Sequence, residues 1–498
     1  MVTSTFPGSD SQEIFGYFSN GEHRVDRDAS AQSLTDPSTG KAWAGVKSSA
    51  SVLGAVVENS RETHAGVWSG ISGSARARMM WDLADLIEKN VDELARLEMM
   101  AAGKLLTTTR REVSRVAAWY RYYAGFTEKL DGRNLSLGTN AVARTAYEPV
   151  GVVAVITPFN ASLSLGTWSI APALASGNVV LVKPPLDAPG SVLFLAQLAV
   201  NAGFPGGVLN VLPGGADIGA ALVEHEDIAM ISFTGSTKVA SLTGAKASGM
   251  FKKYVCEAGG KSAHIVFDDG DLESAFIAAR SGVFSNAGQS CVAGSRLLVQ
   301  SGVYEKFVER FAAGASELRV GDPLEADTHI GPVASAKQLS RIARLVSDAR
   351  EQGAKVLAGG DVPPNLDARL SGGFFFAPTV LTEVTPDMEI WSEEVFGPVV
   401  IVQQFDSEEE AIALANDSPY GLAAGVWTSD MRRAHRMGKR LQAGTVWINT
   451  YRTMDYRVPF GGYKDSGLGR LNGEQALYEF MNTKAIIEGT EPLIDPFN

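Results

Sequence analysis

The sequence predicts an α/β protein with more than one domain, and three observations lead to this prediction. The chain has 498 residues, which is too long for one simple core and indicates two or three domains. From residue 151, short runs rich in β-branched residues alternate with helix-like segments, as in βαβ units with a parallel, doubly wound sheet. A second alternating series begins near Gly260. A domain boundary is therefore expected at the glycine pair Gly259-Gly260.

Helical patterns come first along the chain. Apolar residues recur at helical spacing over residues 75–102, and residues 110–126 also have the pattern of a helix, with aromatic side chains expected in the core. Two series of strands are then expected, at 151–156, 178–182, 208–212 and 229–233, and at 263–267, 296–300, 399–403, 423–427 and 445–449. Residues 127–149 and the C-terminal end fit neither series, and we expect them to form arms that pack on another subunit.

The composition excludes several classes of partner. The chain has 44 Lys and Arg against 56 Asp and Glu, a net charge of −12, which argues against a nucleic-acid or anionic-membrane partner. No run approaches 18 apolar residues, and the N-terminus lacks the pattern of a signal peptide. Cys256 and Cys291 are the only cysteines, which favours a reducing compartment. We therefore expect a cytoplasmic protein with no membrane, nucleic-acid or metal partner.

Cys291 is the candidate nucleophile. It lies in NAGQSCVAGS, a run of small and polar residues between a helix-like segment and a strand, where a loop can expose a thiol. The alternative is a buried small hydrophobe, which is the commoner role of a cysteine. Cys256 follows that alternative, because it lies in the apolar run YVCEA.

Glu257 and Asn160 are candidates to assist a nucleophile. Glu257 ends a strand before AGGK, and a carboxylate partly desolvated there would have a raised pKa and could act as a general base. Asn160 ends TPFN after another strand, where its amide could stabilise an oxyanion. The alternatives are a solvated strand-end glutamate and an ordinary turn asparagine.

Two further strand ends could bind phosphate or ribose. FTGST at 233–237 joins a strand to a helix N-terminus, which can bind phosphate through free N–H groups, although Ser and Thr are common caps without any ligand. Lys183 follows the strand NVVLV, at the edge where open parallel sheets bind ligands, although a solvent-facing lysine is equally expected.

Seven motifs together resemble the aldehyde dehydrogenase superfamily, from about residue 35 to residue 485. They are TPFN at 157, KPP at 183, FTGST at 233, EAGGK at 257, GQSC at 288, EEVFGPV at 393 and PFGGYKDSGLGR at 459. The spacing of 291 − 257 = 34 residues between Glu257 and Cys291 also resembles that of the family. The resemblance implies a Rossmann-type cofactor domain, an α/β catalytic domain and a small β oligomerisation arm, usually in a homodimer or homotetramer.

Carried onto this chain, the resemblance places the cofactor domain at residues 1–126 and 150–259 and the catalytic domain at 260–450. The arm would comprise 127–149 and 477–498, and 451–476 would return to the domain interface. The implied reaction is oxidation of an aldehyde to a carboxylic acid with NAD or NADP. Cys291 would form a thiohemiacetal and then a thioester, Asn160 would bind the oxyanion, and Glu257 would activate the hydrolytic water.

The resemblance also implies a nicotinamide cofactor site. Lys183 would bind the adenosine ribose, Ser236 the pyrophosphate and Glu394 the nicotinamide ribose, with Phe396 packed near the nicotinamide. The flanking residues assigned to the same site are Ile156, Thr157, Pro158, Phe159, Phe233 and Gly235. Leu186 stands where the family often has a glutamate that repels the 2′-phosphate of NADP, so NAD is the first choice and NADP is possible.

The substrate is expected to be aromatic, bulky or a semialdehyde. Ala161, Ser164 and Ser285 are small where many relatives are bulky, which predicts a wide tunnel unless Trp168, Trp119 and Tyr122 fill it. Arg452 and Arg457, in the loop at 450–458, could pair with a substrate carboxylate, although surface arginines are commoner. Two alternative functions stay open: a relative that transfers the thioester to coenzyme A, and a catalytically silent member acting as a binding or structural protein. The presence of Glu257 argues against the first, and the intact Cys291, Glu257 and Asn160 argue against the second.

Overall fold

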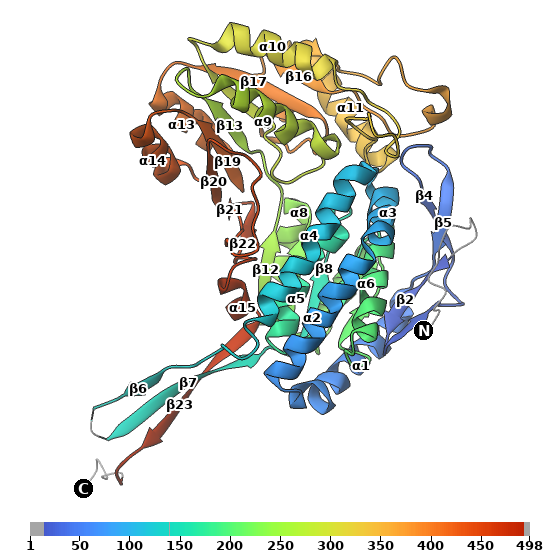
Figure 1. Cartoon of the computed structure of the whole chain (residues 1–498), viewed down its shortest axis with the longest axis vertical. Coiled ribbons are helices and arrows are strands. Elements are labelled where there is room, and N and C mark those ends of the chain that lie inside the picture. The colour runs from blue at the N-terminus through green and yellow to red at the C-terminus, as the bar shows by residue number, and fades with distance from the viewer. Residues whose placement is uncertain (1–13, 139, 493–498) are drawn as a thin grey trace.

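The computed structural model describes residues 14–138 and 140–492, and the chain forms two α/β domains and a projecting arm (Figure 1). Residues 1–13 and 493–498, which the sequence prediction assigned to the cofactor domain and the arm, lie outside the described residues. Among the helices of the described part, none combines the length and apolar character that a bilayer crossing requires.

The first domain contains an eight-stranded sheet in the order β22-β12-β11-β8-β9-β10-β2-β3. The five central strands, β12 to β10, are parallel, and the three outer strands, β22, β2 and β3, each pair antiparallel with their inner neighbour. The four predicted strands of this domain are present within one residue at each start. The bounds are β8 (Val152–Ile156), β9 (Val179–Lys183), β10 (Leu209–Val211), β11 (Met230–Thr234), β12 (Lys253–Glu257), β22 (Gly467–Leu468), β2 (Tyr17–Ser19) and β3 (Glu22–Arg24).

Helices cover both faces of this sheet, which is why its central strands are continuous apolar runs. Val153 and Val155 of β8 pack in one core with the helices α2 to α6, whereas Val152, Ala154 and Ile156 pack in another with α1, α7 and α8. The bounds are α1 (Leu53–Gly66), α2 (Gly73–Lys89), α3 (Val91–Ala102), α4 (Leu106–Ala124), α5 (Ser162–Ala175), α6 (Gly190–Asn201), α7 (Ala216–Glu224) and α8 (Thr237–Gly249).

Residues 75–102, where the helical pattern was continuous, form two helices. The prediction of a single helix there is therefore wrong. The break is at Asn90, whose backbone has φ −117° and ψ 22° between α2 and α3. The Asn90 side chain donates a 2.7 Å hydrogen bond to the Leu86 carbonyl, an example of a short amide side chain competing with the helix backbone. The second predicted helix, at 110–126, corresponds to α4.

The second domain contains a seven-stranded sheet in the order β15-β16-β17-β14-β13-β19-β20, with only the β15 edge antiparallel. The five strands predicted from sequence are contiguous and form five of the six parallel strands. The bounds are β13 (Ala263–Val266), β14 (Arg296–Gln300), β17 (Val399–Phe405), β19 (Ala423–Trp427), β20 (Thr445–Ile448), β15 (Lys355–Ala358) and β16 (Thr379–Thr382). Its helices are α9 (Leu272–Phe284), α10 (Tyr304–Ser316), α11 (Ala336–Glu351), α12 (Glu389–Ser392), α13 (Glu408–Asn416) and α14 (Met431–Arg440).

The arm is a three-stranded antiparallel sheet that projects away from both domains (Figure 1). It consists of β6 (Asn134–Ser136), β7 (Ala141–Pro149) and β23 (Met481–Gly489). Helix α15 (Gln475–Glu479) belongs to the body instead, because Ala476 and Leu477 are buried in the core of the first domain. The C-terminal part of the arm therefore begins at Met481 and not at residue 477. The remaining short strands are β1 (Ile14–Phe15), β4 (Gln32–Thr35), β5 (Ala42–Val46), β18 (Tyr420–Gly421) and β21 (Tyr463–Lys464).

The segment after β20 leads the chain back to the first domain. Within it, β22 pairs with β12, so that Gly467 lies opposite Glu257 and Leu468 opposite Cys256. The chain thus passes between the two domains twice, once after β12 and once after β20.

Candidate active site

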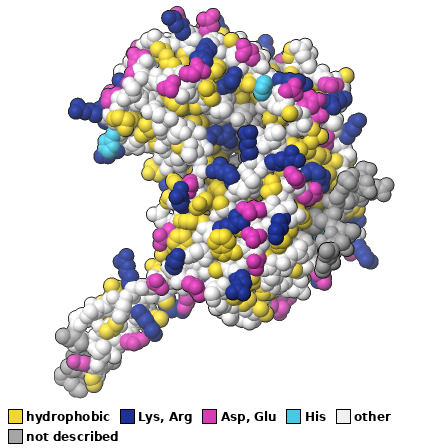
Figure 2. Space-filling model, in the orientation of Figure 1, with side chains coloured by type: hydrophobic (Ala, Val, Ile, Leu, Met, Phe, Trp, Pro, Cys, Tyr) yellow, Lys and Arg dark blue, Asp and Glu magenta, His cyan; other side chains and the backbone are white. Residues whose placement is uncertain are grey.

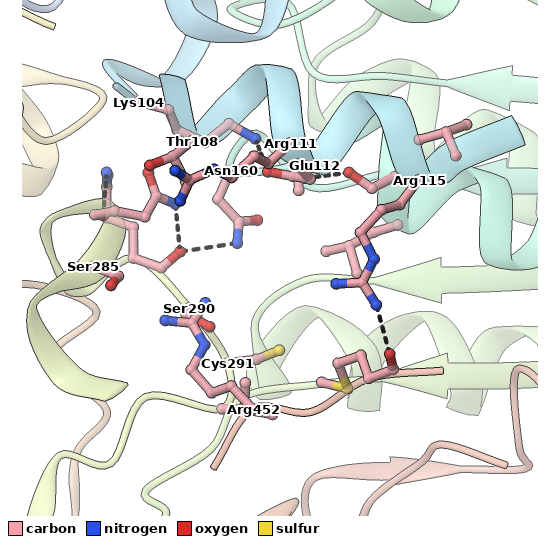
Figure 3. Close-up of a pocket in the computed structure, with 18 of the residues that line it drawn as sticks. Lys104, Thr108, Arg111, Glu112, Arg115, Asn160, Ser285, Ser290, Cys291 and Arg452 are labelled. Carbon is pink, nitrogen blue, oxygen red and sulfur yellow. Dashed lines mark hydrogen bonds and ion pairs between the residues drawn. The ribbon is translucent and has the colours of Figure 1, made fainter. Parts of the chain in front are cut away.

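A cavity of about 330 Å³ lies where the two domains and the returning segment meet (Figure 3). Helix α4 contributes one of its faces, residues at positions 108, 111, 112, 115, 116 and 119, which share a side of a helix by their spacing. The beginning of α5 contributes Ala161 and Ser164, and the returning segment contributes Arg452 and Met454. The second domain contributes the loop from Ser285 to Val292, with Cys291 in the wall.

The loop that holds Cys291 has an unusual backbone. Asn286 and Ala287 have φ of 56° and 50°, and Gly288 follows with φ of 71°. A side-chain carbon at Gly288 would lie 1.9 Å from the Gly397 carbonyl oxygen, so only glycine fits there. Consecutive left-handed residues are costly and occur where surrounding structure holds them, often at functional sites. The small residues before Cys291 are therefore explained by a tight turn that presents the thiol.

Cys291 is half-buried, and its surroundings disfavour the thiolate. Burial, together with the nearby carboxylates of Glu394 and Glu257, raises the pKa of the Cys291 thiol to about 12, while Arg452 acts in the opposite direction. The thiol is consequently protonated at neutral pH and needs a base to become a nucleophile. Cys256, in contrast, packs in a core of the first domain.

Glu257 has the properties of such a base. It is the last residue of β12, it is only 4% exposed, and neither carboxyl oxygen has a hydrogen-bond partner among the described residues. Burial raises the pKa of Glu257 to about 8, with Arg470 opposing the shift. A carboxyl group with a pKa near the working pH can both accept and return a proton.

Asn160 faces the same cavity from the first domain. It follows β8 and is buried, and its Nδ2 donates a 3.0 Å hydrogen bond to the carbonyl oxygen of Gln289, two residues before Cys291 (Figure 3). The amide is thus fixed beside the nucleophile loop, and its second N–H is available for an oxyanion.

The carboxyl ends of the parallel strands place a second group of candidate residues together. Because β8, β9, β11 and β12 are neighbours, Thr157, Lys183 and Gly235 lie along one edge of the sheet, with Glu257 at its end. Lys183 is buried, its Nζ donates to the Gly214 carbonyl at 2.5 Å, and burial lowers its pKa to about 8. This is the edge at which doubly wound sheets bind their ligands.

Ser236 stands at the N-terminus of the 13-residue helix α8, and its hydroxyl makes no capping hydrogen bond within the described residues. The preceding Gly235 packs on the ring of Phe233, where a side-chain carbon would lie 2.7 Å from the ring. A hydroxyl that makes no capping hydrogen bond, preceded by a glycine without a side chain, fits a diphosphate group bound at the helix N-terminus.

Glu394 and Phe396 approach from the second domain. A Glu394 carboxyl oxygen accepts a 3.0 Å hydrogen bond from the Gly260 backbone, and a side-chain carbon at Gly259 would lie 2.5 Å from the other oxygen. Burial raises the pKa of Glu394 to about 7. Phe396 has φ of 55°, and its ring meets that of Phe159 edge to face at 5.7 Å. These groups could hold the ribose and ring end of a dinucleotide.

A sequence profile of the aldehyde dehydrogenase family matches residues 25–486. The chain belongs to the aldehyde dehydrogenase family. It is 41% identical over 478 residues to an aldehyde dehydrogenase of Emericella nidulans, with 95% of each chain covered. It is also 41% identical over 445 residues to the phenylacetaldehyde dehydrogenase of Pseudomonas fluorescens, with 87% of this chain and 88% of that one covered.

The solved structures agree with this assignment. The NAD+ complex of an aldehyde dehydrogenase from Bacillus cereus matches the fold with a TM-score of 0.93 and 39% identity, over 96% of this chain and 97% of that chain. The fold predicted from the family resemblance is therefore confirmed. The protein is an NAD(P)-dependent aldehyde dehydrogenase.

Most of the residues predicted for the substrate tunnel line the cavity of this aldehyde dehydrogenase, and one does not. Those that line it are Ala161, Ser164, Trp168, Ser285 and Arg452. Arg457 points elsewhere: its Nε and Nη2 donate to the two oxygens of Asp455 at 2.8 and 2.9 Å, and the side chain is 68% exposed. The prediction for Arg457 is therefore corrected, because its guanidinium is engaged at the surface.

Trp119 and Trp168 form one wall of the cavity, with their rings stacked at 6.3 Å and 11°. Both rings line the cavity together with the small residues Ala161, Ser164 and Ser285. Tyr122 instead packs on Phe126 and Tyr456.

Sequence reasoning missed the polar residues of the α4 side, namely Lys104, Thr108, Arg111, Glu112 and Arg115. Lys104 is buried between the carboxylates of Glu98 and Glu112, at 3.2 and 2.9 Å. One signal could have revealed them. Residues 108, 112 and 116, and likewise residues 111, 115 and 119, are four apart, which places charged and aromatic side chains on one face of the helix.

Proposed function

We propose that the enzyme oxidises an aldehyde to a carboxylic acid through a thioester on Cys291, with Glu257 as the base and Asn160 as an oxyanion donor. One observation carries the proposal: Cys291, held in a strained loop, shares its cavity with the Asn160 amide and lies within electrostatic reach of the partnerless Glu257 carboxyl. These are the parts that covalent aldehyde oxidation requires.

The first step forms the carbon–sulfur bond. Glu257 in its carboxylate form takes the proton from Sγ of Cys291, and the thiolate attacks the aldehyde carbon. The carbonyl electron pair moves to the oxygen, which accepts hydrogen bonds from Asn160 Nδ2 and the Cys291 backbone N–H. Donors that are already fixed, as Asn160 is by Gln289, stabilise this charge without reorganisation.

The second step oxidises the carbon. As the oxyanion reforms the carbonyl, a hydride leaves the carbon and the Cys291 thioester remains; a bound nicotinamide supplies the chemistry of hydride acceptance. Glu257 releases the proton that it took from Cys291 to solvent, and its carboxylate then removes a proton from water as the water attacks the thioester. The carbon–sulfur bond breaks, the acid leaves, and the proton on Glu257 passes to the Cys291 thiolate.

We further propose that the first domain binds the cofactor and that the second carries the nucleophile. Lys183 and Ser236 would hold the adenosine ribose and diphosphate, and Glu394 and Phe396 the nicotinamide end, with the strand-end residues Ile156, Thr157, Pro158, Phe159, Phe233 and Gly235 around them. The residues of the first domain are supported by the sheet edge that they share and by the uncapped N-terminus of α8. Glu394 and Phe396 are supported by their contacts with Gly260 and Phe159.

NAD is the proposed cofactor, with NADP as the alternative. A Bacillus cereus relative has been solved with NAD+. In this chain Leu186, near Gly215, brings no carboxylate to the position that would repel the 2′-phosphate of NADP. The neighbouring Asp187 is exposed and could repel this phosphate instead. Comparing kcat/KM for NAD and NADP in native enzyme and in Asp187→Asn tests the preference, and a higher value for NADP in the native enzyme would reverse it.

Assembly and location are part of the proposal. The arm presents Leu135 and Ile487 to solvent at 45% and 64% exposure, which supports a homodimer or homotetramer formed through it. Both cysteines are free thiols, which supports a reducing cytoplasm. Light scattering of the native protein and of Ile487→Lys tests the assembly, since a monomer in the native protein would contradict it.

The test of the reaction is reduction of NAD and NADP with aliphatic, aromatic and carboxylated aldehydes, with Cys291→Ser as the control. Mass spectrometry of the product, with and without coenzyme A, separates hydrolysis from acyl transfer. We expect the free acid in both cases. An acyl-coenzyme A product would favour the acylating alternative, and no turnover with any pair would favour the silent one.

A further inference from the structure

The charges that line the cavity are unequal in sign. Lys104, Arg111, Arg115 and Arg452 are cations, whereas Glu112 is the only carboxylate among the described lining residues. Glu98, behind Lys104, adds one more negative charge. The balance is four positive charges against two negative ones, in a protein whose net charge is −12. Such a local excess, opposite to the sign of the whole molecule, attracts an anionic ligand.

The two carboxylates are already engaged. Glu98 and Glu112 both contact the Lys104 ammonium, and Glu112 also accepts a hydrogen bond from the Ser164 hydroxyl. Lys104 and these two carboxylates together carry a net charge of −1. The positive charge of the cavity therefore resides on Arg111, Arg115 and Arg452, of which Arg452 lies within electrostatic reach of Glu112.

None of these three guanidinium groups forms an ion pair with a carboxylate in the described part of the chain. The side chains of Arg111 and Arg452 form no hydrogen bond there either, and Arg115 donates to a neutral group, the Met454 carbonyl, at 2.6 Å. Neighbouring arginines behave differently: Arg110 pairs with Asp92, and Arg457 pairs with Asp455. The three arginines of the cavity thus differ from these two neighbours, which are paired with carboxylates outside it.

Their positions enclose the cavity from two sides. Arg111 and Arg115 come from α4, and Arg452 comes from the returning segment on the side of Cys291 (Figure 3). Arg452 has φ of 57°, a conformation that is uncommon for a residue with a side chain and that needs support from its surroundings. Lys and Arg side chains also gather on the molecular face between the two domains (Figure 2).

We infer that Arg111, Arg115 and Arg452 form a carboxylate-binding subsite, so that the physiological substrate is an aldehyde with a carboxylate at its other end. The inference rests on the proposed function, because it adds an anionic group to the aldehyde that Cys291 attacks. Guanidinium groups bind carboxylates through paired, charge-assisted hydrogen bonds. The body of the substrate would lie along the stacked rings of Trp119 and Trp168. Its oxidation yields a dicarboxylate.

The kinetic test compares matched aldehydes, para-carboxybenzaldehyde with para-methylbenzaldehyde and glutaric semialdehyde with pentanal. We expect the native enzyme to prefer the carboxylated member of a pair. In Arg452→Met and in Arg111→Met, kcat/KM for that member should fall about 10- to 100-fold, the loss expected for hydrogen bonds to a charged group. The neutral member should change less than about threefold. The control is Arg457→Met, on the same loop outside the cavity, which should change neither.

A binding measurement separates failure of this inference from failure of the proposed function. Calorimetry with Cys291→Ser protein compares terephthalate with para-toluate, which differ only in the second carboxylate. The subsite is supported, even if no aldehyde is turned over, when terephthalate binds more tightly than para-toluate and this difference disappears in the double variant Cys291→Ser, Arg452→Met. Equal binding of both anions, or equal losses for carboxylated and neutral aldehydes in the arginine variants, would overturn the subsite while the oxidation of neutral aldehydes stands.

Discussion

The Asn160 side-chain amide donates a hydrogen bond to the Gln289 carbonyl at 3.0 Å, which joins the end of a first-domain strand to the nucleophile loop of the second domain. The Asn286 amide donates to the same carbonyl at 3.1 Å. Gln289 is thus held from both sides, and the loop keeps one anchor if the other is lost.

Replacing Asn160 should therefore impair chemistry more than structure. We expect Asn160→Ala to lower kcat by about 10²- to 10³-fold, the loss typical of one oxyanion donor, with a smaller change in KM. Steady-state kinetics measures both, and circular dichroism checks the fold. A kcat within tenfold of the native value would assign the oxyanion to other donors.

Replacing Glu257 should block hydrolysis of the thioester. In Glu257→Gln the water lacks its base, so turnover should fall by about 10²- to 10⁴-fold. Because Glu257 also deprotonates Cys291, acylation should slow as well. Rapid acid quenching and mass spectrometry should therefore show little acyl group on Cys291 at neutral pH and more of it at high pH, where part of the thiol ionises without a base. The matched variant Glu393→Gln, on a half-exposed neighbour of Glu394, should accumulate no acyl group at either pH. A Glu257→Gln enzyme that is inactive and unacylated even at high pH would contradict the role of Glu257 in hydrolysis.

Glu257 should also make stability depend on pH. Its pKa is raised to about 8 from an ordinary value near 4.5, so ionisation is harder in the folded protein than in the unfolded chain. The free energy of unfolding should consequently fall as pH rises from about 4.5 to about 8 and then level off. The amide introduced by Glu257→Gln cannot ionise, so the Tm of this variant relative to native enzyme should be higher at pH 9 than at pH 5. A difference independent of pH would contradict the raised pKa.

The buried Lys104 should stabilise the wall of the cavity. Lys104→Met leaves Glu98 and Glu112 without their shared cation, and breaking a buried ion pair in this way costs about 3–5 kcal/mol. Thermal unfolding should show a clear decrease in Tm. The control is Lys355→Met, which breaks the exposed pair with Glu383 and should cost less than about 1 kcal/mol. Equal shifts for the two variants would show that burial does not strengthen the Lys104 cluster.

The parallel strands could be predicted because burial on both faces restricts their residues to apolar types. β8 and β9 are buried on both faces, which demands the continuous apolar runs seen in the sequence. β15 escaped prediction because it is short and lies at an edge of the sheet, where Lys355 and Leu357 are exposed. β16 is buried between β15 and β17, but its four residues include two threonines and so form no apolar run.

The site was only partly predictable for a similar reason. The small residues around Cys291 reflect backbone contacts and are visible in the sequence. The cavity face of α4 also recurs at helical spacing, but it mixes Arg, Glu and Trp, so hydrophobicity alone does not mark it as a lining. The sequence offers no reason to distinguish Arg452 from Arg457, because both lie in the same loop. The structure distinguishes them by the left-handed backbone at Arg452 and by the ion pair of Arg457 with Asp455.

The two passages of the chain between the domains both touch the nucleophile loop. At the first, Gly260 lies so close to the Cys291 carbonyl that a side-chain carbon there would be 2.2 Å away, and at the second, the Tyr451 hydroxyl donates to the Val292 carbonyl at 3.1 Å. The backbone of the nucleophile is therefore supported from both connections at once, so that its position does not depend on either connection alone.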